Sequence, residues 1–386
     1  IMKRILHVVN IYFVIPYFLG DQLIYFTKRG YKEYIICSPS EEIYEYSKSH
    51  NFNYKEIPIL RSISFWRDLK AIWEICKYIK KEEIDIVVGH TPKGGVLAML
   101  ASFVMHIPIR IYFRHGLVYE TSSGIKRKFL ILIDRLAAFL STKVVCVSPS
   151  VYKKSLENKL NPASKQLLLH KGTCNGINVE KFCRDNINER TIELLKNQLG
   201  LSENSFVIGY VGRLVKDKGI IELIDAFNVL QKQNINIKLL LVGMLEERDS
   251  LPKDIISKIQ DNTSIICTGY VDNSSIENYY ALMDLFILPS YREGFPTSIL
   301  EASSMKLPVV TTKVTGCIDA ISHGKTGYFV NHDKYEIASV IQKYICDDEL
   351  REKHGMAGRV FVEEDFDQCI IWREIEKLYS INYTNF

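Results

Sequence analysis

Short runs of β-branched and apolar residues alternate along the chain with amphipathic stretches of helical periodicity. In the first half, the runs typical of strands lie at residues 4–9, 33–38, 85–90, 109–114 and 143–148. In the second half, they lie at residues 205–212, 237–243, 264–269, 285–290 and 307–312. Strands separated by helices predict parallel sheets with right-handed crossovers. The pattern therefore predicts an α/β fold.

A break in this alternation divides the chain. Residues 173–203 are polar and lack strand alternation, so we place a hinge there. We expect two Rossmann-like, doubly wound domains that face each other across a cleft, one at 1–172 and one at 173–367. We expect a final helix at about 368–386 to pack back on the first domain. Ligands of such sheets collect where the carboxyl ends of the strands meet, so the loops after the strands are candidates for function.

Composition narrows the class of protein. The 386 residues are 47% hydrophobic, which is enough for two cores. The nine cysteines are scattered and form no CxxC pair, so we expect neither a zinc site nor a disulfide framework. The start MKRILHVVN resembles a strand rather than a signal peptide, and the longest apolar stretch, residues 94–109, is too short to span a membrane. We expect a cytoplasmic protein.

Charge is distributed unevenly. Residues 1–172 hold 26 Lys and Arg against 14 Asp and Glu, whereas residues 173–386 hold 23 against 31. The helical stretches 65–83 and 124–143 combine apolar stripes with basic residues. They either cover a sheet or dock on an anionic membrane surface, and the charge of the first half favours docking.

The stretch GYVGRLVKDKGI at 209–220 follows a predicted strand. Gly212 permits a tight turn, and Arg213 and Lys218 flank a helix that we expect to start near Gly219. Two cations beside a helix N-terminus suit a diphosphate, because amide groups and the helix dipole favour negative charge there. A solvated turn would contain the same residues, so both interpretations stay open. The P-loop and GxGxxG signatures are absent, which weighs against a dinucleotide dehydrogenase.

The stretch YREGFPTSILE at 291–301 contains two glutamates. We expect Glu293 in the exit loop of a strand, Pro296 at the first position of a helix, and Glu301 inside that helix. Carboxylates accept hydrogen bonds from vicinal hydroxyls, such as those of sugars and ribose. The alternatives are a salt bridge at Glu293 and a surface charge at Glu301.

Two loops of the first half carry further candidates. YFRHGL ends a predicted strand with Arg114 and His115, and this histidine either donates hydrogen bonds to a ligand or is satisfied by backbone. In VGHTPKGG, Thr91 suits a helix N-cap and Lys93 lies in the first turn. A cation is unfavourable there unless an anion is near, which mildly favours an anionic ligand over an exposed lysine.

Together, the spaced motifs resemble the family 4 retaining glycosyltransferases of the GT-B fold. They are GR…KDKG (212–219), EGFPTSILEA (293–302), PVVTTKVTGCIDAI (308–321) and GKTGYFV (324–330). HTPKGG and RHGLVYET resemble the subgroup that extends sugars on undecaprenyl diphosphate, such as the diacetylbacillosaminyl-diphospho-undecaprenol N-acetylgalactosaminyltransferases.

The resemblance implies a retaining transfer of a hexose or N-acetylhexosamine. The donor would be a nucleotide diphosphate sugar, with UDP expected as the nucleotide, and the acceptor a lipid-linked saccharide of bacterial surface polysaccharide assembly. Neither nucleic acid nor a cofactor is implied. No metal is expected, because Arg213 and Lys218 would neutralise the donor diphosphate.

Individual roles follow from the same resemblance. Glu301 would bind the ribose hydroxyls, and Glu293 would lie near the donor sugar. The remaining residues implied at the donor are Gly212, Gly219, Phe295, Thr297, Tyr270 and His115, the last toward the donor sugar. The residues implied on the acceptor side are Thr91, Lys93 and Arg114.

Two departures and two alternatives accompany the resemblance. Many family members have a Gly-Gly loop after the first strand, whereas this chain has only Gly20 in NIYFVIPYFLGDQL. Asp319 stands where a glutamate is frequent. A UDP-sugar 2-epimerase of the same architecture and a non-catalytic subunit that binds nucleotide sugars are the alternative functions.

Overall fold

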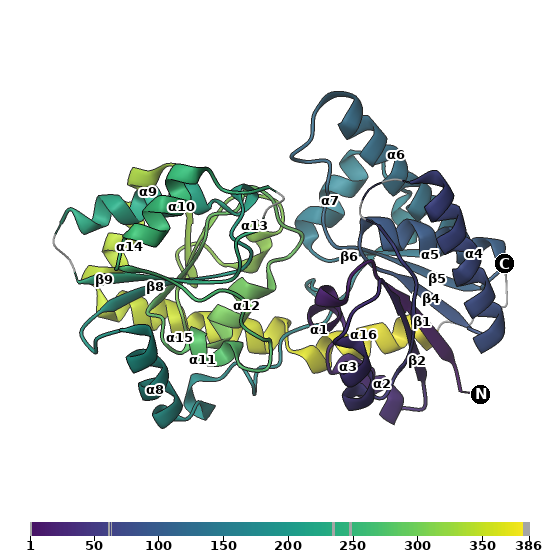
Figure 1. Ribbon diagram of the computed structural model, residues 1–386, viewed down its shortest axis with the longest axis horizontal. Coiled ribbons are helices and arrows are strands. Elements are labelled where there is room, and N and C mark those ends of the chain that lie inside the picture. The colour runs from purple at the N-terminus through teal and green to yellow at the C-terminus, as the bar shows by residue number, and fades with distance from the viewer. Residues whose placement is uncertain (1, 61, 63, 234–235, 247–248, 381–386) are drawn as a thin grey trace. The chain divides into compact units, whose positions relative to one another are not determined.

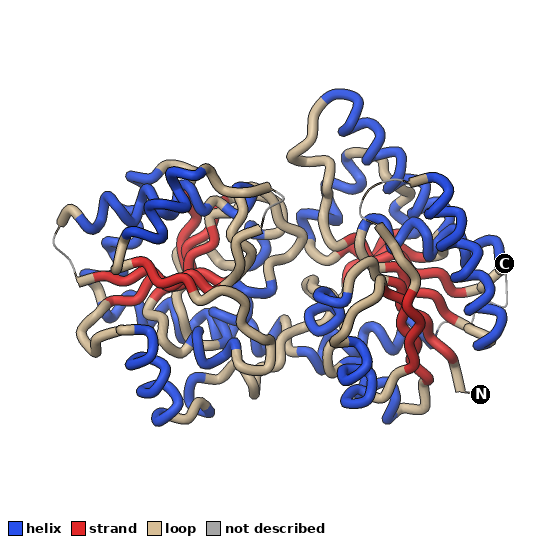
Figure 2. The backbone as a smooth tube through the Cα atoms, in the orientation of Figure 1, coloured by secondary structure: helices blue, strands red, loops and turns tan. Residues whose placement is uncertain are grey.

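A computed structural model describes residues 2–60, 62, 64–233, 236–246 and 249–380. The chain divides into two compact units, which are Ile1–Gly176 with Cys369–Phe386 (unit 1) and Ile177–Gln368 (unit 2). Each unit has one parallel sheet with helices on both faces (Figures 1 and 2). The predicted fold of two Rossmann-like units is confirmed.

The sheet of unit 1 has the strand order β3-β2-β1-β4-β5-β6-β7, and every adjacent pair is parallel. From β1 the chain continues through β2 and β3 toward one edge of the sheet, and from β4 it continues toward the other edge. The boundary between β1 and β4 is therefore a topological switch point. The strands are β1 (Arg4–Val8), β2 (Lys32–Cys37), β3 (Asn53–Glu56), β4 (Ile86–Gly89), β5 (Ile109–Arg114), β6 (Lys143–Cys146) and β7 (Gln166–Leu168).

Helices cover both faces of this sheet. On one face α4 (Phe65–Glu82), α5 (Pro92–Val104) and α6 (Gly124–Leu140) pack side by side (Figure 1). On the other lie α2 (Gln22–Lys28), α3 (Ile43–His50) and α16 (Gln368–Ser380), where Phe26 and Tyr379 pack with their ring centroids 5.1 Å apart. The remaining helical segments are η1 (Tyr12–Val14), α1 (Ile15–Phe18), α7 (Pro149–Glu157) and η2 (Ala163–Lys165).

Unit 2 repeats the winding with the order β10-β9-β8-β11-β12-β13, again all parallel. Its switch point is therefore between β8 and β11. The strands are β8 (Phe206–Val211), β9 (Ile237–Val242), β10 (Ile265–Cys267), β11 (Leu285–Leu288), β12 (Val309–Thr312) and β13 (Gly327–Val330). The sequence pattern missed β3, β7 and β13, which are short strands at the edges of the two sheets.

The helices of unit 2 also form two layers. On one face lie α9 (Ile220–Gln231), α10 (Lys253–Asp261) and α14 (Lys334–Cys346), and on the other α11 (Ile276–Tyr280), α12 (Thr297–Ser304) and α15 (Asp348–Asp365) (Figure 1). The remaining helical segments are η3 (Arg184–Asn186), α8 (Glu189–Leu199), η4 (Lys216–Lys218) and α13 (Cys317–Ala320). The segment 173–203 contains α8, whose Ile192 joins the core of unit 2. Among the described residues, no helix is long and apolar enough to cross a membrane.

Candidate functional site

Three loops meet at the carboxyl edge of the unit 2 sheet, after β8, β11 and β12. The amide of Tyr291 donates to the carbonyl of Asp217 (2.9 Å), and the Arg292 guanidinium pairs with the Asp217 carboxylate (3.3 Å). Gly316 has a φ of 82°, and a Cβ there would lie 2.6 Å from the carbonyl oxygen of Gly294. Only glycine fits at this position, because the backbones of the second and third loops touch.

Lys218 and Glu293 form an ion pair within this cluster. Lys218 Nζ lies 2.5 Å from Glu293 Oε1, and the Ser290 hydroxyl donates to the same oxygen (2.6 Å). The Lys218 side chain is 20% exposed and that of Glu293 10%, so the pair is largely shielded from water. Gly219 has a φ of 72° and directly precedes α9. A Cβ on Gly219 would lie 2.0 Å from the carbonyl oxygen of Pro289, so only glycine allows this close approach. The first turn of α9 is therefore held beside the ion pair.

Arg213 reaches further toward solvent. Its guanidinium pairs with Glu246 (3.0 Å) and its side chain is 46% exposed. Tyr210 donates its hydroxyl hydrogen bond to the Arg213 carbonyl (2.7 Å), which holds the backbone of this loop. Gly212 has a φ of 150° and leaves room for the Tyr210 hydroxyl. An anion at the start of α9 would thus meet one shielded and one accessible cation.

Glu301 is an interior carboxylate, so its interpretation as a surface charge is wrong. The residue is 7% exposed, and Tyr280 donates a hydrogen bond to Oε2 (2.7 Å). Burial raises the pKa of Glu301, while Tyr280 and Lys181 act in the opposite direction. No described residue donates to Oε1, which leaves an acceptor for a hydroxyl.

The prediction for Pro296 is off by one position, because it is the N-cap and α12 begins at Thr297.

The other donor candidates lie around the same edge. Phe295 packs its ring against Phe366 (5.3 Å between centroids), and Thr297 opens α12. Tyr270 follows β10, is exposed and hydrogen-bonds Asp272. Asp319 lies in the short helix α13 after β12.

In unit 1, His115 follows β5 and contacts aromatic rings. Its Nε2 lies 3.0 Å from Nδ1 of His90, and the Phe18 ring stacks on it at 3.8 Å. Burial lowers the pKa of His115 to about 3, so the imidazole is neutral at physiological pH. The alternative that backbone satisfies His115 is wrong for Nε2, since its partner is another histidine. Gly20, the one glycine of the first loop, adopts a φ of 48° and lies close to Pro16 and Asn175.

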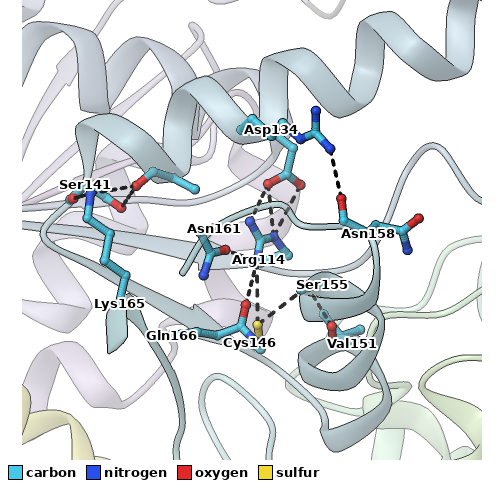
Figure 3. Close-up of polar contacts among 12 residues, drawn as sticks. Arg114, Asp134, Ser141, Cys146, Val151, Ser155, Asn158, Asn161, Lys165 and Gln166 are labelled. Atoms are coloured by element: carbon cyan, nitrogen blue, oxygen red, sulfur yellow. Dashed lines mark hydrogen bonds and ion pairs between the residues drawn. The ribbon is translucent and has the colours of Figure 1, made fainter. Parts of the chain in front are cut away.

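Arg114 does not face a ligand, which corrects its prediction as an acceptor-binding residue. The side chain is fully buried, with Nη2 2.6 Å from Asp134 of α6 and Nη1 bonded to Asn161 (2.9 Å) and Gln166 (3.1 Å) (Figure 3). Cys146 also contacts Nη1. Arg114 points inward because it ends β5 one residue before His115, and successive side chains of a strand point to opposite faces. It stabilises the interior of unit 1.

The start of α5 also differs from expectation. Lys93 pairs with Asp68 of α4 (2.7 Å) and donates to the carbonyl of Ser62. The anion expected near Lys93 is therefore Asp68 of the same chain. Thr91 occupies the N-cap position but adopts a φ of 63°, and among the residues that the structure describes its buried Oγ1 has neither a capping hydrogen bond nor another partner.

Sequence reasoning missed His7, His90 and Glu33. All three are buried near the switch point of unit 1, where His7 lies in β1, Glu33 in β2, and His90 directly after β4. The available signal was a titratable residue within each of three otherwise apolar strand patterns, because buried titratable groups need partners.

Comparison with known families defines the class of this protein. Residues 19–169 match the family described as Glycosyltransferase Family 4, and residues 191–361 match Glycosyl transferases group 1. These matches cover the two units in turn. The chain is a glycosyltransferase with the GT-B fold.

Relatives place it more narrowly. The capsular polysaccharide biosynthesis glycosyltransferase CapM of Staphylococcus aureus is 36% identical over 98% of this chain and 97% of that protein, so the chain belongs to the family 4 glycosyltransferases. The UDP-Gal:alpha-D-GlcNAc-diphosphoundecaprenol alpha-1,3-galactosyltransferase of Escherichia coli is 27% identical over 73% of this chain and 71% of its own length. The N,N'-diacetylbacillosaminyl-diphospho-undecaprenol alpha-1,3-N-acetylgalactosaminyltransferase of Campylobacter jejuni is 25% identical over 81% of each chain.

Solved structures agree on the fold. The crystal structure of Anabaena HepE in complex with UDP and glucose superimposes with a TM-score of 0.80 at 20% identity, covering 99% of this chain and all of that one.

Proposed function

We propose that this enzyme transfers a hexosyl or N-acetylhexosaminyl group, with retention of configuration, from a UDP-sugar to a lipid-linked diphosphate saccharide. The names of the E. coli and C. jejuni relatives state diphosphoundecaprenol acceptors, and that of CapM states capsular polysaccharide biosynthesis. The HepE structure contains UDP. These similarities support the donor and acceptor classes.

The observation that carries the proposal is the Lys218–Glu293 pair at the first turn of α9. A diphosphate bound there would interact with Lys218, with Arg213 and with the N-terminus of α9. Gly212 and Gly219 would let the phosphate oxygens approach the backbone. Glu246 holds Arg213 until an anion competes for it. Because these cations supply the charge compensation, we expect turnover without a divalent metal.

We assign the rest of the donor to α12 and to the loop that precedes it. Glu301 would accept from the ribose hydroxyls through Oε1, since Tyr280 already occupies Oε2. Glu293 and the amides of Phe295 and Thr297 would hold the sugar. Tyr270, in the loop after β10, would lie near the base.

The chemistry proposed for the site is electrostatic. The bond between C1 of the sugar and the β-phosphate oxygen breaks, and its electron pair stays on that oxygen. The acceptor hydroxyl oxygen bonds to C1 on the same face, and its proton passes to the departing phosphate. Negative charge thus develops on the diphosphate, where Lys218 and Arg213 stabilise the transition state more than the ground state.

In unit 1, we assign His115 to a substrate hydroxyl, and Thr91 and Lys93 to the acceptor. Lys93 would exchange Asp68 for an acceptor anion, and the unpaired Thr91 Oγ1 would gain a partner.

Nucleotide release tests the proposal directly. The full-length enzyme is incubated with a panel of UDP- and GDP-sugars, with and without an undecaprenyl-diphosphate-linked saccharide. Acceptor-dependent UDP release with an α-linked product from an α-linked donor supports it. Isomerisation of the free UDP-sugar would indicate an epimerase, and release of GDP alone would overturn the UDP assignment.

We further propose that α4 and α6 dock on an anionic phospholipid bilayer. Large apolar side chains on these helices face solvent, including Trp66 (80% exposed) and Ile125 (87%). The first five residues of α6 include three basic residues and no acidic one, although the helix dipole disfavours cations there. An anionic surface would compensate this charge while the apolar side chains enter the interface.

Vesicle co-sedimentation tests the docking. We expect binding to vesicles that contain phosphatidylglycerol, loss of binding at high salt, and weaker binding of the double variant Ile125→Ser/Phe129→Ser. Leu194→Ser is the control, because Leu194 is also an exposed large apolar residue but belongs to unit 2. Equal binding to neutral vesicles, or no effect of the double variant, would contradict docking through this surface.

A further inference from the structure

A glutamate and three histidines form a continuous chain of polar contacts at the switch point of unit 1. Glu33 Oε2 lies 3.1 Å from His7 Nε2, His7 Nδ1 lies 3.1 Å from His90 Nε2, and His90 Nδ1 lies 3.0 Å from His115 Nε2. The two inner imidazoles use both ring nitrogens within the chain. The outer end is Nδ1 of His115, which has no hydrogen-bond partner among the described residues.

The chain is shielded along most of its length. Glu33, His7 and His90 are each 1% exposed, whereas His115 is half-buried. The ring of Phe18 stacks on His115, and that of Phe113 lies 5.0 Å from His90. A proton can therefore enter or leave this chain most readily at His115.

The contacts allow two directions of hydrogen bonding when every imidazole is neutral. If Glu33 is protonated, it donates to His7 Nε2, His7 Nδ1 donates to His90, His90 Nδ1 donates to His115 Nε2, and the His115 proton is on Nδ1. If Glu33 is ionised, each bond reverses and the His115 proton moves to Nε2. The first arrangement holds four protons with no net charge, and the second holds three with one negative charge.

We propose that Glu33, His7 and His90 are positioning residues that set, through this chain, which nitrogen of His115 carries the proton. With Glu33 protonated, His115 presents an N–H to its ligand. With Glu33 ionised, it presents a lone pair. The use of this N–H by a substrate hydroxyl rests on the proposed function, whereas the coupling between Glu33 and His115 does not.

Burial favours the arrangement with protonated Glu33, while the hydrogen bond and charge of His7 act in the opposite direction on the pKa of this carboxyl. Burial raises the pKa of Glu33 and lowers those of His90 and His115, so the carboxylic acid and neutral imidazoles are the stable forms. The titratable groups beyond the chain are Tyr379 of α16, whose pKa burial and Glu33 raise, and Tyr31, which adds to that shift. No described lysine or arginine contributes to these pKa values, and Oε1 of Glu33 has no partner.

Nitrogen NMR of the full-length protein, labelled at histidine, tests the coupling. The signals of His115 are assigned by their loss in His115→Gln, and the protonated nitrogen is identified from pH 5 to pH 9. We expect a neutral imidazole that carries its proton on Nδ1 at low pH. We expect Glu33→Leu to move this proton toward Nε2, and His90→Phe, which keeps an aromatic ring, to do the same.

Glu56→Gln is the matched control, because Glu56 is an exposed carboxylate on the neighbouring strand β3. It should leave the His115 signals unchanged. Identical His115 signals in wild type, Glu33→Leu and His90→Phe at every pH would overturn the proposal. If Glu33→Leu does not fold, the near-isosteric Glu33→Gln replaces it, and it should make the proton position independent of pH.

A separate kinetic experiment tests whether the substrate depends on the position of the His115 proton. With the donor found in the nucleotide-release assay, we expect Glu33→Gln to flatten the pH profile of kcat/KM, with Glu56→Gln again as the control. An unchanged pH profile with a changed His115 signal would place the chain outside substrate recognition. A failure of all donors would overturn the proposed function and leave the NMR result standing.

Discussion

The two sheets wind in the same order, yet their switch points hold opposite chemistry. In unit 2, the edge between β8 and β11 gathers charged side chains in pairs, Lys218 with Glu293 and Arg213 with Glu246. In unit 1, the edge between β1 and β4 gathers hydrogen-bonded imidazoles beside aromatic rings. One backbone geometry therefore serves either electrostatic stabilisation or directional hydrogen bonding, and the side chains of a few loop positions decide which.

Solvent access explains why each chemistry suits its place. Paired cations at the unit 2 edge remain partly exposed, so an incoming anion can compete for them at modest desolvation cost. In unit 1, burial shifts the pKa values of Glu33, His90 and His115 toward their neutral forms, whereas the buried Arg114 is paired with Asp134. Removing one partner of a charged pair should therefore reduce stability in unit 1 and turnover in unit 2.

The largest effect should follow from breaking the buried pair. Arg114→Met leaves Asp134 without its cation, and we expect unit 1 to lose about 3–5 kcal/mol of stability. All three tryptophans, Trp66, Trp73 and Trp372, belong to unit 1, so their fluorescence during urea unfolding reports this unit. Arg114→Met/Asp134→Leu should recover much of the loss. Arg213→Met breaks an exposed pair of unit 2, which holds no tryptophan, so its unfolding is followed by far-UV circular dichroism. It should cost less than about 1 kcal/mol, and an equal loss in both variants would refute the contrast.

Turnover should respond most to Lys218. We expect Lys218→Ala to lower kcat by about 10²–10³-fold, as for the removal of one preorganised group that stabilises developing charge. Lys216→Ala is the control, since Lys216 is exposed in the same short turn η4. The measurement is acceptor-dependent UDP release, with far-UV circular dichroism as a check on folding, because unit 2 contains no tryptophan. Near-normal kcat in Lys218→Ala would remove this residue from the site.

Glu301→Gln should act on donor binding instead. Replacing the carboxylate weakens acceptance from hydroxyls, and we expect KM for the UDP-sugar to rise about tenfold, which corresponds to about 1.4 kcal/mol. A smaller change in kcat would separate this residue from Lys218. If free UDP and UDP-sugar bind equally well to the variant and the wild type in a thermal-shift titration, the ribose assignment fails.

The smallest effect should be the pH dependence of unit 1 stability. The folded state raises the pKa of Glu33 above its ordinary value of 4.5. Its stabilising contribution is therefore complete below that ordinary value and is lost as pH rises through the folded pKa. We expect wild type to lose stability relative to Glu33→Gln as pH increases, by at most about 1.4 kcal/mol per pH unit. A difference that grows as pH falls would contradict this sign.

Local pattern was enough to predict much of the molecule. The α/β architecture, ten of the described strands and the positions of Lys218, Glu293 and His115 in loops after strands follow from spacing along the chain. The strands β3, β7 and β13, which lie at sheet edges, were missed. Their pairing partners are distant in sequence.

The sequence by itself determined which residues leave the strands at the ligand edge, because side-chain period and turn residues are local properties. Only the tertiary structure decided what those residues meet. It paired Lys93 with Asp68, turned Arg114 inward onto Asp134, and aligned Glu33 and His7 with His90 and His115. Such contacts join residues separated by 20 or more positions, so they depend on strand order and register rather than on any local signal.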